Sequence, residues 1–195
     1  MDHECELEKN IKKYKSLDLC SYFNNRGLTS DADYKLGFLS LGNTSLPVEQ
    51  VSFANDFIYD GIPFRFNKNE TGDNIELAGQ LVNFPSMYIK KLHFLGVSNN
   101  GDFFDDLHFM NDKQCVGTKR LYLSNFLNTH PSFDDKSAIT FTYANTRGGK
   151  RDHYKPNIWY YSIDLEEPLF FNGIKFEDNP SMHIFAITVE LECLG

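Results

Sequence analysis

The C-terminal segment, residues 182–193, alternates apolar and polar side chains along almost its whole length. Its apolar positions recur at every second residue: Phe185, Ile187, Val189, Leu191 and Cys193. Because successive side chains of a strand point to opposite faces of a sheet, this period predicts a half-buried β-strand. A chain that ends in a long strand needs earlier strands with which that strand can pair. This feature therefore restricts the fold to one with a substantial β-sheet.

Strand-like segments also precede this one along most of the chain, and no helical stripe follows residue 16. Asn99-Asn100-Gly101 separates two of them and favours a tight reversal, because both residue types tolerate positive φ. Many short strands separated by turn residues predict an all-β fold, and we expect an antiparallel β-sandwich of the jelly-roll type. The segments are 17–23, 62–66, 74–82, 88–97, 103–110, 119–126, 138–143, 158–165 and 170–176.

The 195 residues suffice for one well-packed domain. Residues 1–16 are charged and predict a short polar arm, with Ile11 and Tyr14 at helical spacing, and residues 17–195 predict a single β-sandwich. The 18 Phe and 10 Tyr fit this fold, because aromatic side chains pack well on a pleated surface. The scattered cysteines lack zinc-site spacing, and Cys20 and Cys193 are expected to be small buried apolar residues.

The net charge of −8 argues against nucleic acid and anionic membranes as partners, because an acidic surface repels phosphate groups. The arm lacks the apolar centre of a signal peptide, and no run approaches the roughly 18 apolar residues that span a bilayer. The sequence as it stands therefore predicts a cytoplasmic protein with no membrane association. The expectation changes to an extracellular protein if a leader has been removed.

Several short motifs occur in an order that carries more information than any one of them. They are Tyr22-Phe23-Asn24-Asn25-Arg26-Gly27-Leu28, Gly61-Ile62-Pro63-Phe64, Asp73-Asn74-Ile75, Leu92-His93-Phe94-Leu95-Gly96 and Asn179-Pro180-Ser181-Met182-His183. In this order they resemble the galactose-binding-like, carbohydrate-binding jelly-roll domains that are often appended to bacterial glycoside hydrolases. The resemblance implies a β-sandwich that holds a sugar on its loops or concave face, often with a structural calcium ion, and no catalysis of its own.

The segment 144–156 is the first candidate for a binding site, because it gathers basic, acidic and aromatic groups between two strands. Arginine offers a planar fork of donors, and tyrosine offers an aromatic face and a hydroxyl to a sugar or a small polar ligand. The alternative is a solvated connection with no specific role. The candidate ligand-binding residues are Arg147, Arg151, Asp152, His153 and Tyr154.

The aromatic run that follows this segment adds one more candidate. Alternation places Trp159 on the same face as Ile163 and Leu165, so we expect Trp159 to be buried. Tyr160 then lies on the other face and is the expected outward-facing residue for stacking on a sugar ring.

Carboxylates near the first loop suggest a calcium site. Asp31 and Asp33 supply the oxygen ligands that calcium prefers, and Glu192 adds a third if the two ends of the chain lie side by side. Aspartates are also ordinary turn residues, and no EF-hand pattern is present. A structural calcium ion and a purely local role for these residues are therefore both open.

Enzyme motifs are scarce in the chain. His93 and His108 lack the spacing of a cupin metal site, lie inside apolar strand runs and are expected to be hydrogen-bonded structural residues. No GxSxG elbow or P-loop occurs. His153 beside Asp152 offers a group for acid–base chemistry near neutral pH.

Three functions remain open from the sequence. The first is a non-catalytic, lectin-like carbohydrate-binding protein. The second is a small stand-alone enzyme that acts on a sugar or a cyclic metabolite. The third is an interaction or assembly subunit that binds a partner protein or forms a homo-oligomer.

Overall fold

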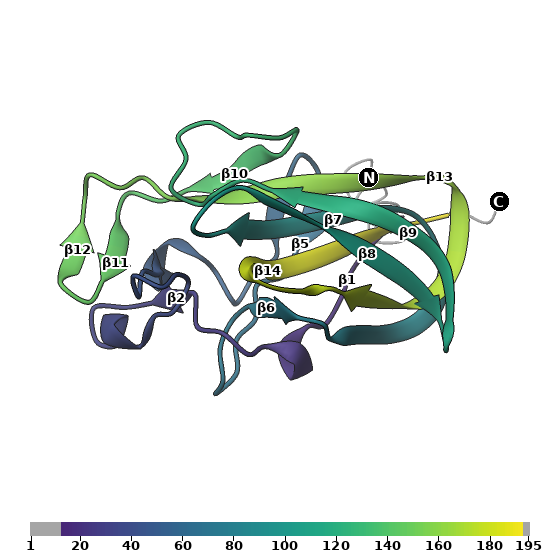
Figure 1. The fold of residues 1–195 in the computed structure, drawn as a ribbon, viewed down its shortest axis with the longest axis horizontal. Coiled ribbons are helices and arrows are strands. Elements are labelled where there is room, and N and C mark those ends of the chain that lie inside the picture. Colours follow the sequence, from purple (N-terminus) through teal and green to yellow (C-terminus); the bar gives the residue numbers. More distant parts are fainter. Residues whose placement is uncertain (1–12, 193–195) are drawn as a thin grey trace, which may run out of the picture.

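The structure, a computed structural model, describes residues 13–192. Its centre is an eight-stranded antiparallel sheet with the order β1-β14-β7-β13-β8-β9, to which β10 adds against β13 and β6 against β14 (Figure 1). The all-β antiparallel prediction is therefore confirmed. The strands of this main sheet are β1 (Tyr14–Ser16), β6 (Ile75–Ala78), β7 (Leu81–Ser98), β8 (Phe103–Asn111), β9 (Gln114–Leu123), β10 (Lys136–Thr140), β13 (Asn157–Phe176) and β14 (Asp178–Leu191).

Besides the main sheet, the fold contains short strands and single helical turns. Within residues 13–192 no helix is long and apolar enough to cross a bilayer. Three two-stranded sheets pair β2 (Leu28–Thr29) with β3 (Leu46–Pro47), β4 (Phe57–Tyr59) with β5 (Ile62–Phe64), and β11 (Ala144–Thr146) with β12 (Gly149–Arg151). The single turns of 3₁₀-helix are η1 (Cys20–Tyr22), η2 (Tyr34–Leu36) and η3 (Val48–Gln50).

One pair of expected strands is joined into a single long bent strand, and another expected strand is longer than predicted. The segments 158–165 and 170–176 both belong to β13, whose pairing with β7 shifts register between Asp164 and Leu169. A β-bulge of this kind bends a strand without ending it, so a break in alternation need not mark a turn. The segment 88–97 likewise forms only the second half of β7.

The N-terminal boundary differs from the expectation. Tyr14–Ser16, assigned to the polar arm, form β1 and pair antiparallel with β14. The prediction of a strand at 17–23 is wrong. Asp18 Oδ1 accepts a hydrogen bond from the Cys20 backbone N–H, and the chain turns into η1 there. Ile11, the partner of Tyr14 in the predicted helical spacing, lies outside the described residues.

Two hydrophobic cores lie against the sheet. In Figure 1, β8 and β9 curve across the rest of the sheet, and their buried residues pack with those of β7, β13 and β14 in the first core. The second core joins the sheet to the chain between residues 28 and 66. Phe94 belongs to the first core and the next residue, Leu95, to the second, as expected for a strand buried on both faces.

A buried hydrogen-bond network connects these parts. His183 on β14 has no exposed surface, and its Nδ1–H donates to Asn74 Oδ1 at 3.0 Å while its Nε2 accepts from Asn99 Nδ2 at 2.8 Å. Asn74 Nδ2 in turn donates to the backbone oxygen and to Oδ1 of Asn25, both at 3.1 Å. The network ties the chain before β2 to the main sheet and fixes the second core in place.

Candidate functional site

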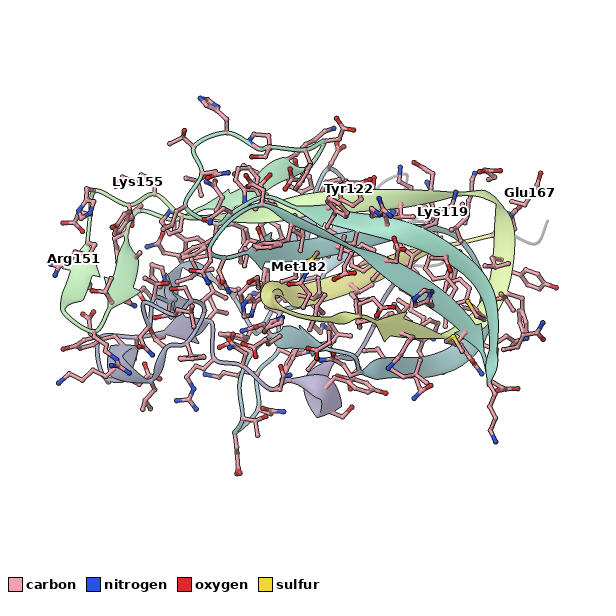
Figure 2. All side chains as sticks on the ribbon, in the orientation of Figure 1. Lys119, Tyr122, Arg151, Lys155, Glu167 and Met182 are labelled. Carbon is pink, nitrogen blue, oxygen red and sulfur yellow. The ribbon has the colours of Figure 1, made fainter. Side chains whose placement is uncertain are left out.

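The segment 144–156 forms the β11–β12 hairpin and the turn that follows it. The five candidate residues in this segment are all exposed, and Figure 2 shows Arg151 projecting from β12 at one end of the molecule. The His153 and Tyr154 rings contact each other with their centroids 4.1 Å apart. The structure thus gathers Arg147, Arg151, Asp152, His153 and Tyr154 on one projecting hairpin, and none of them lines either of the two clefts described below.

Trp159 is buried, as predicted, and its Nε1–H donates to the Asn125 backbone oxygen at 3.1 Å. Tyr160 lies on the opposite face. It is half-buried rather than exposed, because the β4–β5 hairpin covers it. The ring of Tyr59 lies 4.9 Å from the Tyr160 ring, and Phe64 contacts it edge-on. Tyr160 therefore lies apart from the other five candidate ligand-binding residues.

The three candidate calcium ligands are not brought together. Asp33 Oδ1 accepts hydrogen bonds from the backbone N–H and the hydroxyl of Ser30, and Asp31 pairs with Lys150 at 3.1 Å. Glu192 follows β14, which ends at the opposite end of the long axis from β2 (Figure 1). Among residues 13–192 no group of three or more His, Cys, Asp or Glu side chains is arranged to hold a metal ion. Asp33 makes a local contact of the kind that turn residues make, whereas Asp31 pairs with Lys150 on the distant strand β12.

A cleft of about 830 Å³, the larger of the two described in this subsection, lies between residues 14–20 and the β4–β5 hairpin. One wall is formed by β1 and the segment up to Cys20, and the other by residues 56–67. The Ser16 hydroxyl joins the walls by donating to the Pro63 backbone oxygen at 3.1 Å. The apolar part of the lining consists of Tyr14, Leu17, Ile58 and Pro63.

Charged groups line the same cleft. Arg65 donates from Nε and Nη2 to Asp56 Oδ1 at 2.9 and 2.8 Å, which leaves Asp56 Oδ2 outside the pair. Asp18 stands on the other wall beside Cys20, whose thiol pKa is raised by burial and by the Asp18 hydrogen bond. The cleft therefore presents carboxylate acceptors and a guanidinium donor next to apolar side chains.

Asp56 and Arg65 were not among the residues predicted from the sequence, although a signal for them was present. Asp60 and Gly61 both have positive φ, as an Asp-Gly hairpin turn requires. The pairing of Phe57 with Phe64 places Asp56 and Arg65 on the adjacent step, where opposite charges on neighbouring strands attract. Reading Asp60-Gly61 as a hairpin would have located this pair.

The second cleft, about 560 Å³, lies over Asp73 and is bordered by Arg26 and Lys68. Asp73 accepts hydrogen bonds from the backbone N–H groups of Gly27 and Leu28 at 2.9 and 3.0 Å. Burial nevertheless raises the pKa of Asp73 to about 6. Its carboxylate mainly holds the backbone before β2.

A polar cluster lies behind the larger cleft, on the same face of the sheet. His93, on β7, is 2% exposed, and its Nδ1 lies 2.9 Å from the Tyr160 hydroxyl. Its other nitrogen, Nε2, lies 3.8 Å from Glu190 Oε2. Tyr14, which lines the cleft, packs edge-on against the His93 ring at 5.8 Å. Burial lowers the pKa of His93 to about 4, so the imidazole is neutral at pH 7.

Comparison with known proteins agrees with this architecture. No curated protein matches the sequence. A family model described as the AziU2-like beta-sandwich domain matches residues 13–192, the whole of the described sandwich. The chain therefore belongs to the AziU2-like β-sandwich domain family.

Proposed function

We propose that this domain binds a small neutral polyhydroxylated ligand, a sugar, in the larger cleft. The observation that carries the proposal is the mixed lining: Asp56, Arg65 and Asp18 offer hydrogen-bond acceptors and donors beside Tyr14 and Ile58. A sugar presents hydroxyl groups around an apolar ring face, and ligand sites commonly combine apolar walls with a few placed polar groups. The volume of about 830 Å³ lies within the usual range of small-molecule sites.

The exposed side chains of the cleft support this role. Ile58 lines the cleft on the same hairpin as the Asp56–Arg65 pair, and it is 59% exposed. A ligand that covers this apolar side chain removes it from water, which stabilises the complex. The projecting β11–β12 hairpin offers charged groups too, but it lines neither cleft and so surrounds a ligand less completely.

The test is a titration of the protein with a panel of neutral monosaccharides and disaccharides, followed by isothermal calorimetry and ligand-observed NMR. We expect saturable binding of at least one sugar. Asp56→Ala removes a charged hydrogen-bonding partner, which is worth about 1.5–3 kcal/mol, so the affinity should fall by about tenfold or more. Ile58→Ala should weaken binding by a smaller factor.

Arg151→Ala is the matched control, because it removes a charged side chain from the β11–β12 hairpin and leaves the cleft intact. It should bind like the unaltered protein. Loss of binding in Arg151→Ala with retention in Asp56→Ala would move the site to the hairpin. The absence of binding to every sugar in the panel would overturn the proposal.

A further inference from the structure

One nitrogen atom of the polar cluster lacks a partner. Of the buried side-chain nitrogen and oxygen atoms in residues 13–192, only His93 Nε2 and Asn145 Oδ1 have no hydrogen bond. Leaving such an atom unpaired costs about 1–3 kcal/mol, so its position calls for a reason. An acidic group faces this nitrogen: Oε2 of the Glu190 carboxylate lies 3.8 Å from His93 Nε2.

The neighbours of His93 define which nitrogen carries the proton. A carboxylate only accepts hydrogen bonds, so Glu190 favours the tautomer with the proton on Nε2. Nδ1 is then an acceptor, and the Tyr160 hydroxyl at 2.9 Å must donate to it. The result is a hydroxyl hydrogen-bonded to an imidazole, whose second nitrogen faces a carboxylate at 3.8 Å, within ion-pair range but beyond hydrogen-bond distance.

The surrounding elements hold this series in place. The Tyr160 ring stacks on the His93 ring at 5.9 Å with an interplanar angle of 21°. Glu190 is anchored through its other oxygen by Lys13 at 3.3 Å, and its side chain is 13% exposed. The other titratable groups facing the series are Lys91 on β7, Asp164 on β13, Tyr14 on β1, and Tyr59 and Asp60 on β4 and its turn.

We propose that Tyr160, His93 and Glu190 form a catalytic-triad-like relay in which the Tyr160 phenol is a nucleophile toward activated acyl esters. The phenol oxygen attacks the acyl carbonyl, and its proton passes to His93 Nδ1 while Glu190 stabilises the resulting imidazolium. The bond from the acyl carbon to the alcohol oxygen then breaks. The departing alkoxide takes the proton from His93, which leaves an acyl group on Tyr160. This reactivity is separate from sugar binding in the cleft.

Assisted attack differs measurably from the ordinary reaction of a tyrosine. Burial raises the pKa of Tyr160, so spontaneous phenolate is scarce at pH 7. Burial lowers the pKa of His93 to about 4, so the base is already neutral at that pH. The assisted rate is therefore independent of pH between 6 and 8, whereas attack by spontaneous phenolate rises about tenfold per pH unit.

The experiment treats the protein with p-nitrophenyl acetate and follows acetylation at each tyrosine by peptide mass mapping. Tyr161, on the opposite face of the same strand, is an internal control, because burial also raises its pKa but it lies outside the relay. We expect Tyr160 to be acetylated at least tenfold faster than Tyr161 at pH 7. The Tyr160 rate should stay level between pH 6 and 8.

Two variants separate the relay from a structural role. His93→Gln keeps a polar group of similar size but removes the base, and it should slow acetylation of Tyr160 at least tenfold. Glu190→Gln should slow it less, by about threefold to tenfold. Equal acetylation of Tyr160 and Tyr161, or an unchanged Tyr160 rate in His93→Gln, would overturn the proposal. If His93→Gln does not fold, the pH profile of the unaltered protein decides, and a tenfold rise per pH unit refutes the relay.

Discussion

The two buried histidines of the main sheet differ in how completely they are hydrogen-bonded. His183, on β14, uses both ring nitrogens, one to Asn74 and one to Asn99. His93, on β7, uses only Nδ1, which faces Tyr160. Burial lowers the pKa of both, to about 3 for His183 and about 4 for His93. Two histidines of the same sheet thus differ: both ring nitrogens of His183 are hydrogen-bonded, whereas one ring nitrogen of His93 is not.

This contrast separates residues that build the fold from residues that are free for chemistry. His183, Asn74 and Asn25 all belong to the short motifs on which the family resemblance rests, and they form one buried network. Such a satisfied network specifies how the second core sits on the sheet. The motifs therefore describe a scaffold. His93 also belongs to a motif, but its Nε2 has no hydrogen-bond partner among the described residues.

Removing His183 should have the largest effect on stability. His183→Ala leaves Asn74 Oδ1 and Asn99 without their partner and opens a cavity in a fully buried site. We expect the free energy of unfolding to fall by about 3–5 kcal/mol, measured by urea denaturation at pH 7.5. The matched control is His108→Ala on β8. That ring is hydrogen-bonded to Thr118 and Glu177 near the surface, and its loss should cost less than about 1 kcal/mol. Equal losses in the two variants would contradict the role given to the network.

A glycine beside the network offers a second way to disturb it. A Cβ added at Gly72 would lie 1.9 Å from the Asn25 backbone oxygen, so the chain that carries Asn25 must move. We expect Gly72→Ala to lower the free energy of unfolding by about 2–3 kcal/mol, again by urea denaturation. Gly42→Ala is the control, because its Cβ would meet only Ser40 Oγ at an ordinary 3.5 Å. A Gly72→Ala protein as stable as Gly42→Ala would show that the network tolerates displacement.

Alternation along the chain was enough to predict much of the sheet. The segment predicted at 103–110 corresponds to β8, Phe103–Asn111, and the reversal at Asn100 and Gly101 has positive φ at both residues. Burial of Trp159 followed from the same alternation. Alternation reports only which face a side chain occupies, so it did not reveal that β7 and β13 continue through bends. Those bends depend on register shifts between strands that are distant in the sequence.

The candidate sites were harder to predict for a related reason. The larger cleft joins residues 14–20 to residues 56–67, and the polar cluster joins Glu190 to His93 and Tyr160 across three strands. Tyr160 was selected as outward-facing, but the cover over it comes from β4 and β5. His183 received no role from the sequence, because its partners lie in separate loops. Charge density along the chain drew attention to 144–156 instead, whose five candidate residues are exposed in the structure.

The pH dependence of stability should separate the contribution of His93 from that of the other groups. Below pH 6.5 the unfolded chain binds protons at both buried histidines that the folded protein does not bind, so acid lowers the free energy of unfolding. Asp73 acts in the opposite sense between its ordinary pKa of 3.8 and about 6, because the folded state holds its proton more tightly.

His93→Gln removes one of these contributions and leaves the others. Between pH 5.5 and 4.5 we expect the free energy of unfolding to fall less steeply in His93→Gln than in the unaltered protein. The difference should be about 1.4 kcal/mol per pH unit. Urea denaturation at several pH values measures both slopes. Identical slopes would mean that His93 titrates alike in the folded and unfolded states, which its burial and its neighbours contradict.

The smallest expected effect concerns the one hydrogen bond that His93 does make. Tyr160→Phe removes the hydroxyl that faces Nδ1, and since Tyr160 is half-buried, we expect a loss of about 1 kcal/mol in the free energy of unfolding. A double-mutant cycle with His93→Gln should give a coupling energy of about 0.5–1.5 kcal/mol. Tyr59→Phe, which keeps the ring in contact with the Tyr160 ring, should show no coupling to His93→Gln. If Tyr160 and His93 are uncoupled while His183→Ala remains severely destabilising, His93 would be isolated from its neighbours and the contrast between the two histidines would be sharper still.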